Sequence, residues 1–146
     1  MYARIACAIA CFIATTESST ASDHCLQYEP SKVAVTGSIF ERTDWGPPNY
    51  GEDPTHDTRE RHDYIRLKTT LCVIGNTRSD SYDQTERNVK FMELAWDPEK
   101  MPFPRVVGRH AVLHGTLFHG FDGHHHTRVL LSVTAVEPLE GPRKAN

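Results

Sequence analysis

The amino-acid sequence predicts an all-β fold, a five-stranded OB-like barrel with a long loop between the first and second strands. Five segments carry the β-branched and aromatic residues, or the alternation of apolar and polar side chains, that are typical of strands. Glycines inside the first and fourth segments favour bulges that let long strands curl into a barrel. The alternative is a small β-sandwich, which normally needs two more strands.

Each element follows from its own pattern along the chain. The predicted strands are residues 33–40, 64–74, 89–96, 110–119 and 127–136. Gly37 and Gly115 stand inside the first and fourth of these strands, where glycine indicates a bulge or a tight bend. Residues 43–63 contain three prolines and two glycines, which predicts a loop. A loop of this length in a small domain is usually functional or disordered.

The first 21 residues are typical of a secretory signal peptide. Arg4 precedes an apolar run over residues 5–14, and the small residues that end at Ala21 resemble a cleavage site. The run is about ten residues long, shorter than the roughly 20 that a membrane-spanning helix needs, so no span is expected after cleavage. Two alternatives are a buried core helix and a lipoprotein site at Cys11.

Residues 22–146 are then expected to form a single exported domain, secreted or periplasmic. The chain has 16 lysines and arginines against 19 aspartates and glutamates, which gives a net charge of −3. A chain of this charge lacks the basic surface that general nucleic-acid binding requires. No nucleic-acid partner is therefore expected.

Two cysteines, Cys25 and Cys72, remain after the predicted cleavage. In an exported domain two cysteines most simply form one disulfide, and two buried free thiols are the alternative. The sequence has no C-x-x-C motif, so neither a zinc ribbon nor a thioredoxin-type redox site is supported.

The segment 119–127, "HGFDGHHHT", holds four of the nine histidines of the chain. Its Asp122-Gly123 pair is typical of a two-residue type I′ hairpin turn. Because side chains alternate between the two faces of a strand, the register of this hairpin decides which imidazoles share a surface. The predicted pairs are His119 with His126, Gly120 with His125, and Phe121 with His124. The predicted face holds His119, Phe121, His124 and His126, whereas His125 points to the opposite face.

Three imidazoles on one surface can ligate a metal ion. His119, His124 and His126 form the candidate metal site, for zinc, copper or nickel. An open fourth position would allow metal-assisted hydrolysis, but no nearby carboxylate is placed as a general base, and no catalytic residue is predicted. The alternative is a polar hairpin whose imidazoles hydrogen-bond one another and the backbone, in which case no cofactor is needed.

The long first loop is the second candidate for function. In OB barrels the loops that join strands 1–2 and strands 4–5 flank the common binding face. The first loop contains "WGPPNY", where two aromatic side chains flank a stiff pair of prolines. The alternative is a rigid loop that packs on itself over one end of the barrel. The candidate ligand-binding residues are Trp45, Pro47, Pro48, Asn49 and Tyr50 on the first loop, and His119, Phe121 and His125 on the second.

Four motifs, "CLQYEPSKVAVTGSIF", "GPPNY", "LCVIG" and "GTLFHGFDGHHHTRVLL", are distributed over the chain from Cys25 to about Val136. Their combination resembles the bacterial domain-of-unknown-function family 4431. The resemblance implies an exported bacterial protein and assigns no activity.

The sequence therefore predicts an exported, non-enzymatic binding module. Its two loops are expected to contact a protein partner or a component of the cell envelope such as a glycan, which includes an inhibitor or immunity role. The alternative function is a metal-binding or metal-dependent protein built on His119, His124 and His126. A nucleic-acid-binding OB module ranks third, because charge and predicted export argue against it.

Overall fold

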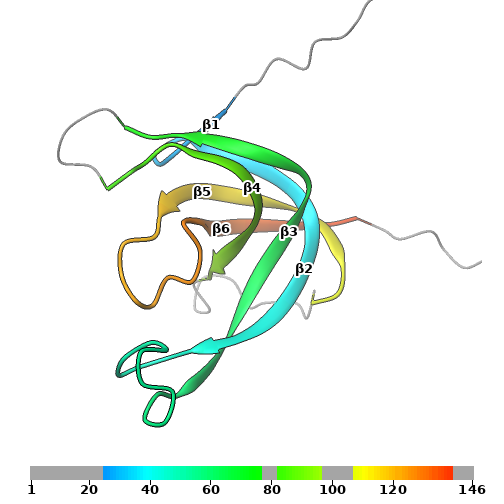
Figure 1. Cartoon of the computed structure of the whole chain (residues 1–146). Coiled ribbons are helices and arrows are strands. Elements are labelled where there is room, and N and C mark those ends of the chain that lie inside the picture. Colours follow the sequence, from blue (N-terminus) through cyan, green and yellow to red (C-terminus); the bar gives the residue numbers. More distant parts are fainter. Residues whose placement is uncertain (1–24, 77–81, 97–106, 140–146) are drawn as a thin grey trace, which may run out of the picture.

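The computed structural model describes residues 25–76, 82–96 and 107–139, and these residues form six β-strands and no helix (Figure 1). The all-β prediction is therefore confirmed. The strands are β1 (Leu26–Gln27), β2 (Lys32–Trp45), β3 (Arg59–Ile74), β4 (Glu86–Ala95), β5 (His110–His119) and β6 (Val129–Pro138). Within these ranges, no helix has the length and apolar character that crossing a membrane requires. The expected signal peptide lies outside the described residues.

Strands β2 to β6 correspond to the five predicted strands, and β1 is an additional strand of two residues. The bounds of β5 are those predicted, whereas β2 continues to Trp45, beyond its predicted end at residue 40, and β3 begins at Arg59, before its predicted start at residue 64. The loop between β2 and β3 therefore covers residues 46–58 and not 43–63.

Polar contacts across β2 and β3 explain why the sequence pattern missed these extensions. The Arg61 guanidinium lies 3.2 Å from the Glu41 carboxylate on the opposite strand. Arg42 forms an ion pair of 2.7 Å with Asp44 on its own strand, β2, and donates a cross-strand hydrogen bond of 2.9 Å to the Tyr64 hydroxyl on β3. Cross-strand pairs of this kind stabilise a strand without the apolar alternation that marks it in a sequence.

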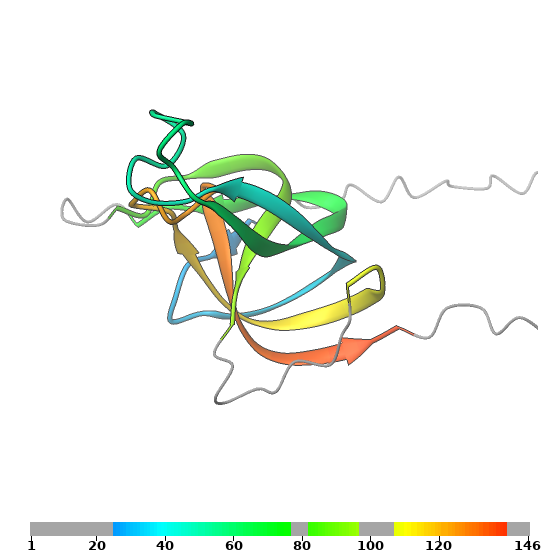
Figure 2. The same ribbon diagram turned by 90° about the horizontal axis from the view of Figure 1, so that it is seen from below.

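All six strands belong to one mixed sheet. β2 pairs antiparallel with β3 and β5, and β5 pairs antiparallel with β6. β4 pairs parallel with β6 and antiparallel with β3, so the pairings run β3–β2–β5–β6–β4 and return to β3. β1 adds a short parallel strand beside β3. Figure 2 shows how the ribbons of β2 and β3 bend along their length.

Apolar side chains from one face of each strand fill the core. Along β5, Ala111, Leu113 and Leu117 are buried and alternate with more exposed neighbours, as the two-residue period of a strand requires. Each fully buried leucine or valine contributes roughly 1.5–3 kcal/mol relative to an exposed one. The rest of this cluster is Tyr28, Val33, Val35, Ile39, Ile65, Val73, Met92, Leu94, Val129, Leu131 and Val133.

The two predicted strand glycines lie where backbones come into close contact. A Cβ atom on Gly37 would overlap the carbonyl oxygen of Arg66, and one on Gly115 would overlap that of Ser132. The register between β5 and β6 also shifts at His114–Gly115, which is the irregularity that a mid-strand glycine predicts. Both positions therefore require the absence of a side chain.

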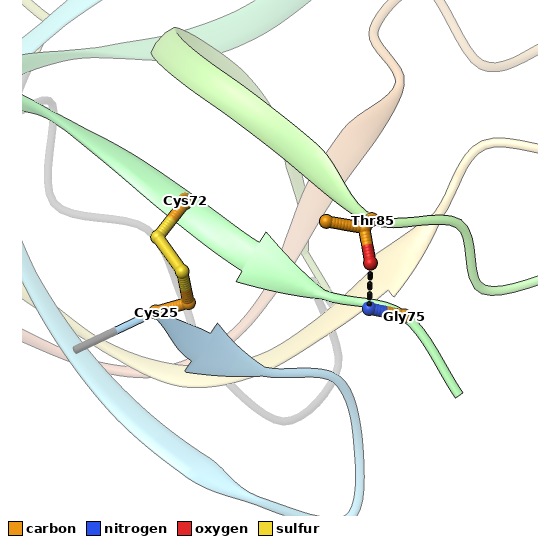
Figure 3. The surroundings of a disulfide bond; sticks show 4 residues. All are labelled: Cys25, Cys72, Gly75 and Thr85. Atoms are coloured by element: carbon orange, nitrogen blue, oxygen red, sulfur yellow. Dashed lines mark hydrogen bonds between the residues drawn. A yellow bond between two sulfur atoms is a disulfide. The ribbon is translucent and has the colours of Figure 1, made fainter. Parts of the chain in front are cut away.

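A disulfide joins Cys25 to Cys72, as predicted, and their Cα atoms lie 4.6 Å apart (Figure 3). Cys25 directly precedes β1 and Cys72 lies near the end of β3, so the bond fixes the chain entry to the sheet. Nearby, the backbone N–H of Gly75 donates a hydrogen bond of 3.0 Å to the Thr85 hydroxyl, which connects the segments that follow β3 and precede β4.

Candidate functional site

The loop of residues 46–58, which joins β2 to β3, contacts the loop of residues 120–128, which joins β5 to β6. The Tyr50 hydroxyl lies 2.6 Å from Nε2 of His124, and their rings pack edge to face at 4.7 Å. The Tyr50 ring also lies against Gly123, where it leaves no room for a side chain. Both views show the two loops side by side (Figures 1 and 2). The two predicted loops therefore do share one end of the sheet.

Tyr50 is held in an uncommon conformation. Its φ of 53° is in the left-handed region that residues other than glycine seldom adopt, and the following Gly51 has a φ of 102°. Desolvation, with added repulsion from the carboxylates of Glu60 and Asp122, raises the pKa of the Tyr50 hydroxyl. The hydroxyl therefore remains protonated at neutral pH and can donate its hydrogen bond to His124.

The first loop is organised around the carboxylate of Asp57. This group accepts backbone hydrogen bonds from Asn49 and Gly51, each of 2.7 Å, and a longer one from Asp53. Desolvation raises the pKa of Asp57, but these backbone hydrogen bonds outweigh it and lower the pKa below its ordinary value. The base of the loop is closed by two further backbone bonds, from Gly46 N–H to Thr58 O and from Thr58 N–H to Pro47 O.

Trp45 ends β2 with its ring already covered. The Arg59 guanidinium stacks over the ring at 4.0 Å, and Gly51 lies against the ring edge. Pro47 is half-buried, whereas Pro48 and Asn49 are exposed. The exposed tip of the predicted aromatic loop is therefore Pro48-Asn49, and Trp45 forms its base.

The predicted register of the histidine hairpin is wrong. His119 pairs with Val129 and not with His126, and β5 and β6 are joined by the nine residues 120–128. A type I′ turn needs positive φ at both of its central residues, but Asp122 and Gly123 are not among the described residues with positive φ. Instead the Asp122 carboxylate accepts the His124 backbone N–H at 3.0 Å, and the Asp122 carbonyl accepts that of His125. This local capping by aspartate replaces the two-residue turn.

The structure directs the four histidines of this segment to different partners. His119 lies 3.1 Å from the Glu86 carboxylate, whereas His124 faces Tyr50 as described above. His125 packs against the Phe121 ring at 4.7 Å. The predicted trio of His119, His124 and His126 is therefore not brought together around one point.

His126 instead points into a group that the sequence analysis did not identify. Among the described residues, His62, Glu93 and His126 are the group of three side chains that could hold a metal ion, with ligand atoms within 4.8 Å of one another. Glu93 is also the one buried charged residue of the described ranges, at 5% exposure. The sequence does indicate that Glu93 is unusual, because it is the one charged residue in the apolar run "FMELAW".

An open groove of about 520 Å³ lies beside the second loop. Two large aromatic side chains line it and are mostly exposed, Tyr82 at 76% and Phe121 at 63%, with ring centroids 6.3 Å apart. Its other lining residues are Gln84, His119, Gly120, Asp122, His125, His126, Thr127 and Arg128. Of the predicted ligand-binding residues, His119, Phe121 and His125 therefore share this groove.

Comparison with known proteins identifies one family. Residues 91–137 match the family described as Domain of unknown function (DUF4431), and this segment contains Glu93, β5, the second loop and all of β6 except its last residue. No curated protein and no solved structure matches the chain. The match supports the resemblance to the domain-of-unknown-function family 4431 that the sequence motifs indicate, over residues 91–137.

Proposed function

We propose that this protein is an exported, non-enzymatic binding module that contacts a protein partner or an envelope component such as a glycan. The observation that carries the proposal is the contact between loops 46–58 and 120–128 beside a groove with two exposed aromatic side chains. Exposed aromatic groups beside polar side chains are typical of recognition surfaces, because they offer large contact area with little conformational entropy to lose.

The strand pairing favours an OB-like barrel as the scaffold of this surface. The five long strands pair in a ring in which only β4 and β6 are parallel. In an OB barrel the loops after the first and fourth strands flank the binding face. Those loops are residues 46–58 and 120–128 here, and they are the two loops in contact.

The chemistry of the groove is suited to a ligand with both apolar and polar faces. Tyr82 and Phe121 can stack on the apolar face of a sugar ring or on an apolar peptide side chain. His119 and Arg128, which both contact the Glu86 carboxylate, add polar groups next to them. The net charge of −3 gives no reason to expect a nucleic acid.

A photo-reactive diazirine amino acid at position 121 tests this proposal, because a diazirine captures proteins and glycans alike. In the source organism we expect a covalent adduct from position 121 and none from position 135. Ala135 is the matched control because it is exposed on β6, outside the lining of the groove. The adduct is identified by mass spectrometry.

The second part of this test measures affinity for the captured component. The double variant Tyr82→Ala/Phe121→Ala is expected to bind it at least about tenfold more weakly, since truncation of aromatic contact residues commonly costs more than 1 kcal/mol. Because both side chains are mostly exposed, the circular dichroism spectrum should not change. Equal capture from positions 121 and 135, or undiminished affinity of the double variant, would contradict the proposal.

Export is the second part of the proposed function. A disulfide is expected in an oxidising compartment, and the sequence of residues 1–21 is typical of a signal peptide. N-terminal sequencing of protein recovered from the periplasm or medium of a bacterial host should begin at Ser22. Recovery only from the cytoplasm, with Met1 retained, would refute both the export and the cleavage site.

A further inference from the structure

Three polar side chains from separate elements converge below the two loops. His62 comes from β3, Glu93 from β4, and His126 from the second loop. His62 Nδ1 lies 3.1 Å from Glu93 Oε1, and His126 Nδ1 lies 3.6 Å from Glu93 Oε2. Ligand atoms bound tetrahedrally at 2.0–2.1 Å from a zinc ion lie roughly 3.4 Å from one another. The two separations are therefore close to those of a metal site.

The hydrogen bonding of His126 leaves its Nδ1 without a proton in the neutral ring. Nε2 lies 3.0 Å from the backbone carbonyl of Trp45, which can only accept, so Nε2 carries the ring proton. Nδ1 is buried, has no hydrogen-bond partner, and directs its lone pair towards the Glu93 carboxylate. Two acceptors that face each other repel, and a cation between them satisfies both.

His62 adopts a matching arrangement. Its Nδ1 faces Glu93, whereas its Nε2 is buried without a hydrogen bond and lies 3.7 Å from a Glu60 carboxylate oxygen. The His62 and His126 rings lie 4.5 Å apart. Both rings thus present Nδ1 to one carboxylate and direct Nε2 towards an oxygen on the other side. Metal-binding histidines commonly fix their tautomer and ring orientation by a hydrogen bond from the second nitrogen, as His126 does with the Trp45 carbonyl. His62 Nε2 makes no such hydrogen bond.

The site is shielded from water and its carboxylate is positioned. The side chains of His62, Glu93 and His126 are 23%, 7% and 13% exposed. The His126 backbone N–H donates a hydrogen bond of 2.7 Å to Glu93 Oε2, which orients the carboxylate. A buried carboxylate destabilises the fold unless it is paired, and a bound cation compensates its charge directly.

We propose that His62, Glu93 and His126 bind one divalent metal ion, zinc being the ion that suits two imidazoles and a carboxylate. Three protein ligands leave a fourth position for water. The ion would connect β3, β4 and the second loop and, through the Trp45 carbonyl, the end of β2. It would fix the base of both loops. The site does not depend on the proposed partner, and it replaces the hairpin trio as the metal site.

Zinc alone is the probe that tests the site. The chain is purified, stripped with a chelator, and titrated with Zn²⁺ in competition with a chromophoric chelator. We expect one ion per chain, and a loss of affinity of at least about 100-fold in His62→Gln, Glu93→Gln and His126→Gln, because each removes a direct ligand. His114→Gln is the matched control, since His114 pairs with Glu137 on β6 outside the cluster, and its affinity should not change.

Two further readouts keep the test independent of folding defects. Circular dichroism and thermal unfolding of each stripped variant show whether it folds, and Co²⁺ bound to the unmodified chain should give visible absorption of a site with nitrogen and oxygen ligands. No binding at micromolar zinc, or unchanged affinity in the folded Glu93→Gln variant, would overturn the proposal. Loss of affinity in His124→Gln but not in His62→Gln would place the ion on the hairpin histidines and would also overturn it.

Discussion

Replacement of Cys25 and Cys72 by serine is expected to lower the free energy of unfolding by about 2–4 kcal/mol. The two residues are 47 positions apart, so the bond closes a large loop in the unfolded chain. The chain-entropy relation gives about 4 kcal/mol for a loop of this size, and measured values for disulfides are typically somewhat smaller. Denaturant unfolding of the mature domain, followed by circular dichroism, measures the change.

The same measurement on the unmodified domain with reducing agent is the matched control. It removes the bond without the substitution, and it should lower stability by a similar amount. Thiol titration of the unfolded, unreduced domain should find no free thiol. Two free thiols, or equal stability of the double serine variant and the unmodified domain, would contradict the prediction.

The effect on the candidate site should be small, because the bond and the loops lie at opposite ends of β3. Cys72 stands two residues before the last residue of β3, whereas the loop of residues 46–58 leads into Arg59 at its start. At a temperature where the double serine variant remains folded, we therefore expect its affinity for zinc to match that of the unmodified chain. This result would show that stability and the proposed metal binding can be changed separately.

The fold could be predicted where apolar periodicity is uninterrupted. The run His110–His119 alternates in this way and its bounds were predicted correctly. The last residues of β2 and the first residues of β3 could not be predicted in this way. Residues there, such as Glu41 and Arg61, are polar and are stabilised by their cross-strand partners. No pattern within one strand reveals that pairing.

The site was predicted only in part, for a related reason. Contact between the two loops followed from the expected architecture, and the disulfide from the number of cysteines. The histidine register failed because the Asp122 side chain caps its own turn, which a dipeptide rule does not include. His62 and Glu93 are 31 positions apart in the sequence and meet because β3 pairs with β4. His126 joins them because the second loop leads into β6, which also pairs with β4.

Substitution of Gly115 by alanine is expected to lower the free energy of unfolding by roughly 2–4 kcal/mol. At an unstrained position the same change stabilises a protein by about 0.4–1 kcal/mol, because alanine restricts the unfolded chain. At Gly115 the new methyl group would overlap the carbonyl oxygen of Ser132 on β6, a backbone atom that cannot rotate away. The register shift between β5 and β6 would have to change to accommodate it.

Thr116→Ala is the matched control for Gly115→Ala. Thr116 is the next residue of β5, is half-buried and pairs with Ser132 in the same ladder, so its truncation should change stability by less than about 1 kcal/mol. Denaturant unfolding of both variants separates steric overlap from any general sensitivity of the strand. A Gly115→Ala variant as stable as the unmodified chain would show that the strands can move apart at this point. Because β6 begins directly after the second loop, movement of β6 would also allow His126 to shift away from Glu93.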